Sequence, residues 1–148
     1  MKILTRAIAS FAVAGVLSLG GCGMMPNANI VKLGGTLSGS SEVPPVSSAG
    51  SGMVEATFNK QTNTLSWKVV YSGLSGPAGA GHFHGPAGAG QNTGVVLGFK
   101  GSVESPIVGE AVLTPAQMAD LLAGKWYVNL HTKANPGGEI RAQVMPAN

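Results

Sequence analysis

The chain has 148 residues, a formal net charge of +3 and a single cysteine. Its nine Lys and Arg residues form no cluster and its aromatic residues are scattered, so the charge pattern of a nucleic-acid-binding protein is missing. A single cysteine cannot form an internal disulfide. The fold must therefore rest on burial and hydrogen bonds, and the length fits one ordinary domain.

The amino terminus has the layout of a secretory signal peptide. Lys2 and Arg6 precede an apolar run over residues 7–19, which is shorter than the roughly 20 apolar residues of a membrane-spanning helix. The run ends in Leu19-Gly20-Gly21-Cys22, which resembles the lipobox of bacterial lipoproteins, whose cysteine is lipidated and becomes the first residue. The alternative is an ordinary secreted protein with an unpaired thiol in an oxidising compartment.

We predict a lipoprotein-type signal peptide over residues 1–21, a lipidated tether over residues 22–30 and one domain over residues 31–146. Cleavage before Cys22 would leave 127 residues and lower the net charge from +3 to +1, because two basic residues are removed. The expected location is the cell envelope, with the membrane as a partner through the lipid. Gly23 stands where an aspartate would retain a lipoprotein at the inner membrane, so the outer membrane is expected in a Gram-negative host.

Short apolar stretches separated by Gly, Ser, Thr and Pro predict an all-β domain. The clearest strand covers residues 65–71, and residues 52–58 alternate in the same way. Residues 59–63 are expected to join these two strands as a hairpin. The pattern predicts an antiparallel β-sandwich or barrel, immunoglobulin-like or superoxide-dismutase-like, with one short helix.

The helix is predicted after Thr114, which is a good N-cap residue. Pro115 suits the first helical position, and Gln117 completes a capping box. Gly124 is expected to end the helix. Earlier in the chain, the prolines of the Glu42-Val43-Pro44-Pro45 segment favour an extended edge segment.

Two strands are predicted over residues 126–132 and 138–144, on either side of a turn over residues 133–137. Alternation divides each strand into an apolar inner face and a polar face that we expect to be the outer one. The polar face carries Tyr127, Asn129, His131, Glu139, Arg141 and Gln143. Tyr127, Asn129 and Arg141 are candidates for contact with a partner or for the second shell of a metal site.

The sequence Gly-Pro-Ala-Gly-Ala-Gly occurs twice, at residues 76–81 and 85–90, and is expected to form two flexible loops. Between the copies lies a short predicted strand that contains His82 and His84. In a strand these two imidazoles point to the same side, where they can take adjacent positions around one metal ion.

His131 also lies opposite the apolar side of its strand and is expected to face Glu139 across the turn. Glu139 could then ligate a metal or fix the tautomer of His131. The candidate metal ligands are thus His82, His84, His131 and Glu139, and imidazole ligands favour Cu or Zn. The alternative is that the histidines and Glu139 hydrogen-bond loop backbones and hold the glycine-rich segments in place.

Four segments resemble the CHRD domain, a family named after chordin: residues 37–45, 82–87, 127–132 and 136–143. The resemblance spans about residues 33 to 145. It implies an all-β domain found in animal chordins and in many bacterial exported proteins, whose role in bacteria is largely unassigned. The motif positions that match the family are His82, His84, His131, Glu139 and Arg141, and Ala142 stands where glycine is common.

These observations favour an envelope binding module that holds a metal ion or small ligand. One alternative is a structural or adhesive domain, in which Tyr127, Asn129 and Arg141 contact envelope proteins. A metal-dependent redox enzyme related to superoxide dismutase is less favoured, because a dismutase site needs more histidines than the three present. A serine hydrolase would need a Gly-x-Ser-x-Gly elbow, and the sequence has none, so we expect no enzyme.

Overall fold

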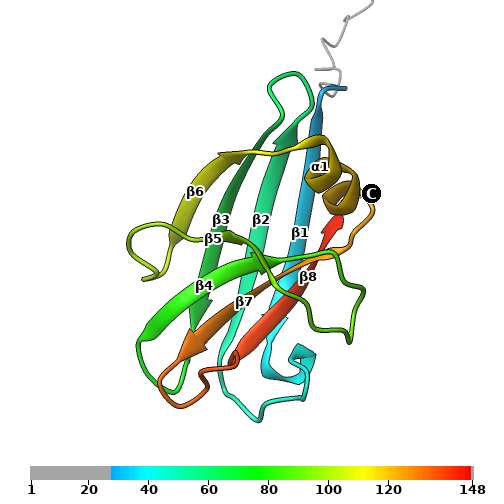
Figure 1. The fold of residues 1–148 in the computed structure, drawn as a ribbon. Coiled ribbons are helices and arrows are strands. Elements are labelled where there is room, and N and C mark those ends of the chain that lie inside the picture. Colours follow the sequence, from blue (N-terminus) through cyan, green and yellow to red (C-terminus); the bar gives the residue numbers. More distant parts are fainter. Residues whose placement is uncertain (1–27, 148) are drawn as a thin grey trace, which may run out of the picture.

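A computed structural model describes residues 28–147, which form a single antiparallel sheet and one α-helix (Figure 1). The predicted signal peptide and Cys22 lie outside the described residues. The elements in chain order are β1 (Ile30–Ser38), a 3-10 turn (Gly39–Ser41), β2 (Ser51–Asn59), β3 (Thr64–Ser72), β4 (Ala78–His84), β5 (Val95–Gly98), β6 (Ile107–Val112), α1 (Pro115–Leu122), β7 (Trp126–Thr132) and β8 (Ile140–Pro146). The prediction of an all-β fold with one short helix is confirmed.

The eight strands follow the order β5-β4-β7-β8-β1-β2-β3-β6, and every neighbouring pair is antiparallel. The sheet curls into a half-barrel around its apolar face (Figure 1). Trp67 on β3 and Phe83 on β4 show the extent of the curl, because their ring centroids lie 5.3 Å apart although four strands lie between β3 and β4 in the sheet. The core therefore fills the concave side of one sheet.

The β2–β3 hairpin forms where the sequence predicts it. Asn59 pairs with Thr64, and the Oδ1 atom of Asn59 accepts hydrogen bonds from the backbone N–H groups of Gln61 and Thr62 in the turn. The apolar positions of both strands are buried as alternation requires: Val54, Ala56, Phe58, Leu65, Trp67 and Val69.

Helix α1 begins and ends as predicted. The Thr114 side chain accepts a hydrogen bond from the backbone N–H of Gln117, and the Gln117 side chain accepts one from the backbone N–H of Thr114. Leu121 is fully buried against the sheet, and Gly124 follows the helix with a φ of +69°. Within residues 28–147, no helix has the length and the apolar character needed to cross a membrane.

Two predictions about the segments between strands were wrong: the first glycine-rich copy and the Glu42–Pro45 segment. The first glycine-rich copy is not a loop, since β4 already begins at Ala78; only the second copy, at residues 85–90, lies in a connection. The Glu42–Pro45 segment is not a sheet edge but a turn that follows the 3-10 helix, and Glu42 is buried. Proline does exclude this segment from the sheet ladder, but the chain bends inward there.

Candidate metal centre

Three histidines come together where β4 and β7 pair. His82 and His84 lie on the same side of β4, and His131 lies on β7, two residues beyond Asn129, the partner of His82. The Nδ1 atom of His82 is 3.1 Å from the Nε2 atom of His131, and one ligand nitrogen from each of the three rings lies within 4.8 Å of the others. Two nitrogens bound to one tetrahedral zinc lie about 3.3 Å apart, so small side-chain rotations would close the site.

Backbone carbonyls orient two of the three imidazoles. The Nδ1 atom of His131 lies 2.9 Å from the carbonyl oxygen of Pro136, and the Nδ1 atom of His84 lies 3.0 Å from that of Thr93. A carbonyl only accepts hydrogen bonds, so Nδ1 of each ring carries a proton. In His131 the lone pair of the neutral ring is then on Nε2, which faces Nδ1 of His82. Metal-binding histidines in proteins are commonly oriented in this way.

The surroundings also keep two of the rings neutral. Burial lowers the pKa of His82, and the nearby His131 and His84 lower it further. Burial likewise lowers the pKa of His84, although hydrogen bonds that the ring donates to Thr93 and Asn129 act in the opposite direction. A neutral imidazole is the form that binds a metal. Protons therefore compete with a metal for these nitrogens less strongly than they would at a free histidine.

One contact would have to change on metal binding. The Nε2 atom of His84 lies 3.0 Å from the side-chain Oδ1 atom of Asn129, which occupies the direction a metal would need. His82 and His131 are more accessible, since both line a surface depression together with Pro77–Ala80, Lys133 and Pro136. A fourth coordination position would open towards this depression.

The face that we expected to be exposed is covered. Tyr127, Asn129 and Arg141 are only 3%, 3% and 1% exposed, because the connection over residues 85–94 lies across them. The prediction that these side chains form an outer contact patch was therefore wrong. Alternation separates the two sides of a strand, but it does not say whether a later segment covers the polar side.

A stack of three side chains lies at the centre of the covered face. The His84 and Tyr127 rings are parallel, with centroids 4.6 Å apart, and the Arg141 guanidinium carbon lies 3.4 Å from the Tyr127 centroid. His84 and Arg141 reach Tyr127 from the strands on either side of β7. A cation and an aromatic ring at this distance attract each other strongly when both are buried.

This stack holds the covering connection. Arg141 donates to the carbonyl oxygen of Gln91 at 2.7 Å and to the side-chain oxygen of Asn92 at 2.9 Å. The hydroxyl of Tyr127 donates to the carbonyl oxygen of Thr93, and Gln143 donates to that of Ala87. These polar residues thus brace the connection that contains the second glycine-rich copy. The alternative interpretation of the sequence gave this role to the histidines and Glu139, and of these His84 contacts the connection, at Thr93.

Glu139 does not join the histidines. The register across the turn is the predicted one, since Leu130 pairs with Ile140, but Glu139 precedes β8 and follows Gly138, whose φ is +128°. Strand alternation therefore does not fix its direction. Its carboxylate accepts hydrogen bonds from the hydroxyls of Ser48, Ser75 and Thr132, the backbone N–H of Ser75 and the amide of Asn135.

These hydrogen bonds lower the pKa of Glu139 to about 2 despite its burial. A carboxylate that is fully buried and so well satisfied is an anchor for three loops. The expectation that Glu139 ligates a metal or orients His131 is thus not supported by the geometry, and Pro136 orients His131 instead. Backbone carbonyls leave no signal in a sequence, so this partner could not be predicted.

Glu42 is a second buried carboxylate that the sequence did not single out as a site residue. Burial raises its pKa, and the side chain of Asn129 and the charge of Arg141 oppose that effect. It lies near Asn129 and Arg141, which belong to the covered face. Its link to Asn129 connects it indirectly to His84.

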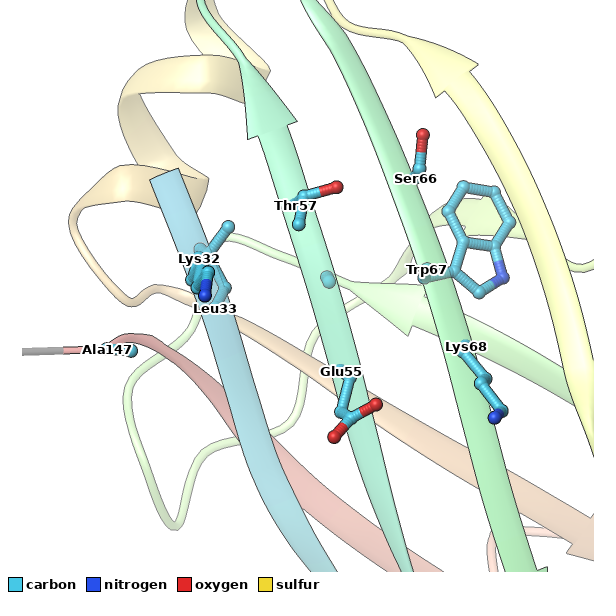
Figure 2. Close-up of a pocket in the computed structure, with 9 residues that line it drawn as sticks. Lys32, Leu33, Glu55, Thr57, Ser66, Trp67, Lys68 and Ala147 are labelled. Atoms are coloured by element: carbon cyan, nitrogen blue, oxygen red, sulfur yellow. The ribbon is translucent and has the colours of Figure 1, made fainter. Parts of the chain in front are cut away.

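Another hollow lies on the convex face of β1, β2 and β3 (Figure 2). Lys32, Glu55 and Lys68 project around the small side chains of Thr57 and Ser66. In the part of the chain that the structure describes, the only group of three potential metal ligands is the histidine cluster, so this hollow is not a competing metal site.

One comparison with known proteins gives a match. No solved structure matches the chain. The family model of the CHRD domain matches residues 33–144, which include the three histidines, Glu139 and Arg141. CHRD domains are in general non-enzymatic β-fold domains of binding and interaction. The chain therefore belongs to the CHRD domain family.

Proposed function

We propose that this protein is an exported envelope lipoprotein whose CHRD domain binds a Cu or Zn ion through His82, His84 and His131. The observation that carries the proposal is the convergence of three imidazole nitrogens within 4.8 Å from two strands. Two of the rings have Nδ1 held by backbone carbonyls, so both would ligate through Nε2. In His84 this requires Nε2 to give up its contact with Asn129. Cu and Zn are the metals that imidazole ligands suit best.

Three protein ligands with an open fourth position are typical of zinc sites that bind an exchangeable ligand. The depression beside His82 and His131 would give that ligand access. The site would hold its ion without a carboxylate, because Glu139 is engaged elsewhere. An open fourth position is also found in catalytic zinc sites. We expect a binding role here because CHRD domains are in general non-enzymatic.

Metal content tests this proposal. The purified protein would carry Cys22→Ser, so that no thiol competes for metal, and would be loaded with Zn, Cu or Co and dialysed. We expect one equivalent per chain and a tetrahedral Co²⁺ absorption spectrum. His82→Ala and His131→Ala should each weaken binding at least about tenfold, whereas Glu139→Gln should leave the stoichiometry unchanged. Unchanged affinity in both histidine variants would contradict the proposal.

We also propose that the membrane is a partner through a lipid on Cys22, with residues 22–30 as the tether. The support is the Leu19-Gly20-Gly21-Cys22 motif after a short apolar run. In a Gram-negative host, Gly23 favours the outer membrane. Labelling cells with a radioactive fatty acid should label the wild-type protein but not Cys22→Ser. Equal membrane association of both forms would contradict this part of the proposal.

A second candidate is a protein-interaction domain of the envelope that binds no metal. It is favoured by His84, both of whose ring nitrogens already face oxygen acceptors. The residues predicted for its contact patch are buried, so its partner would have to contact another surface. Wild-type protein that takes up no metal under saturating conditions would favour this candidate.

A further inference from the structure

A groove lies between the two ends of the sheet. In the described part of the chain, β5 and β6 are the terminal strands, and each has a partner strand on one side only. The groove of about 460 Å³ between them is lined by Leu97, Gly98, Phe99 and Lys100 on one side, Val108–Val112 on the other, and Trp67. Two unpaired strand edges therefore border the same apolar groove.

Trp67 joins the two sides. It pairs with Gly109 of β6 in the ladder. The indole ring lies against Gly109, because a Cβ atom at that position would come within 2.5 Å of the ring. The indole then stacks on Phe99, with centroids 5.6 Å apart. Figure 2 shows the ring between β3 and the neighbouring strand.

Trp67 is only 7% exposed, and its indole N–H is buried without a hydrogen-bond acceptor. A buried donor without an acceptor is unfavourable, because it has lost its hydrogen bond to water. Among the described residues the Trp67 indole N–H is the only buried side-chain donor without an acceptor, and its ring lines the groove. A ligand that brings an oxygen atom to the indole N–H would satisfy it.

The ends of the groove differ. The connection over residues 99–106 joins β5 to β6 and closes one end, and Tyr71 fastens it by donating from its hydroxyl to the carbonyl oxygen of Val103. At the other end Val95 and Val112 are 56% and 73% exposed. Native edge strands normally carry several charges, prolines or bulges that prevent pairing. Within β6 the charged residue is Glu110, which lies between the exposed residues Val108 and Val112.

We propose that this groove binds an extended peptide segment of a partner protein, which adds a strand to β6 and places apolar side chains over Trp67 and Phe99. Main-chain groups provide the affinity and alternate side chains the specificity in such strand addition. A second folded copy of this domain fits less well, because β5 and Lys100 border the opposite side of the groove. This proposal does not depend on the metal site.

The test uses a synthetic peptide of alternating Thr and Val with Lys at each end, and the same peptide with its central amides N-methylated. The readout is the indole N–H signal of Trp67 in ¹⁵N NMR spectra, with fully buried Trp126 as the internal reference. We expect a saturable downfield shift of the Trp67 signal only. The N-methylated peptide, which keeps its side chains but lacks donors, should bind at least about tenfold more weakly.

Two variants with the same charge change sharpen the test. Val108→Lys adds a charge beside the groove, whereas Met53→Lys adds it on β2, outside the groove; both residues are more than half exposed, so both variants should fold. We expect Val108→Lys to weaken peptide binding at least about tenfold and Met53→Lys to leave it unchanged. No saturable shift, equal binding of the N-methylated peptide, or a concentration-dependent dimer that accounts for the shift would overturn the proposal.

Discussion

The Nδ1 atom of His82 lies 3.1 Å from the Nε2 atom of His131, although 49 residues separate the two in the sequence. The contact exists because β4 and β7 are neighbours in the sheet while α1, β5 and β6 lie between them in the chain. Pro136 holds His131 from the far side, so the pair is built by two strands and a turn. The stability of this arrangement should depend on pH.

Without metal, we expect the free energy of unfolding to fall as the pH drops below about 6.5. Burial lowers the pKa of His82 and His84, so the unfolded chain binds protons that the folded chain does not. The loss begins at the ordinary histidine pKa and ends at the lower folded values. Urea unfolding at several pH values in the presence of a chelator would measure it.

Comparison with a His82→Gln/His84→Gln variant isolates this effect. Glu42 acts in the opposite direction, because its raised pKa makes its ionised form less favourable in the folded state. That contribution is present in both proteins and cancels in the difference. A variant whose pH dependence between 7 and 5 equals that of the wild type would show that the histidines are not the cause.

Glu139→Gln should destabilise the fold by about 2–3 kcal/mol, because the amide keeps one acceptor and brings a donor to a site that supplies only donors. Urea unfolding at pH 7 would measure the loss. Glu55→Gln, at an exposed position on β2, is the matched control and should change stability by less than about 0.5 kcal/mol.

The Glu139 carboxylate should also make the stability of the fold depend on pH in the acid range. Its folded pKa of about 2 lies below the ordinary value of 4.5, so its contribution is complete above pH 4.5 and is lost as the pH falls towards 2. Glu139→Gln should therefore lose less stability than the wild type over that range. Parallel stability curves for the two proteins would refute the anchoring role of the carboxylate.

Arg141→Lys should loosen the connection over residues 85–94. Lysine keeps the charge but cannot both stack on Tyr127 and donate to Gln91 and Asn92. We expect a loss of about 2 kcal/mol in stability and faster amide hydrogen exchange in residues 85–94. Lys68→Arg, on the exposed face of β3, is the control. Unchanged exchange in this segment would contradict the role assigned to Arg141.

Gly109→Ala should lower the free energy of unfolding by about 1–3 kcal/mol. The reason is that the alanine Cβ atom would lie 2.5 Å from the Trp67 ring and force the ring to move. Gly79→Ala is the matched control in another strand, since nothing lies within 4 Å of the Cβ position there. Thermal unfolding of both variants, together with Trp67 fluorescence, would measure the difference. Equal stability of the two variants would mean that the indole does not need the space at Gly109.

Several local features could be predicted from the sequence because neighbouring residues decide them. Alternation in β2 and β3 is set by the period of a strand, and the capping box of α1 by contacts between Thr114 and Gln117. The placement of His82 and His84 on one side of β4 follows for the same reason. Even the register across the turn before β8 was correct, since a short turn leaves few choices.

The sequence by itself thus determined five of the strands (β2, β3, β4, β7 and β8), the helix, the family resemblance and the candidate histidines, but not β1, β5 and β6. Only the tertiary structure decided which polar residues are buried, because the connection over residues 85–94 covers Tyr127 and Arg141 from a distance in sequence. It also decided the direction of Glu139, because Gly138 interrupts the alternation just before β8. The groove beside Trp67 exists only once the sheet has curled and brought its two ends together.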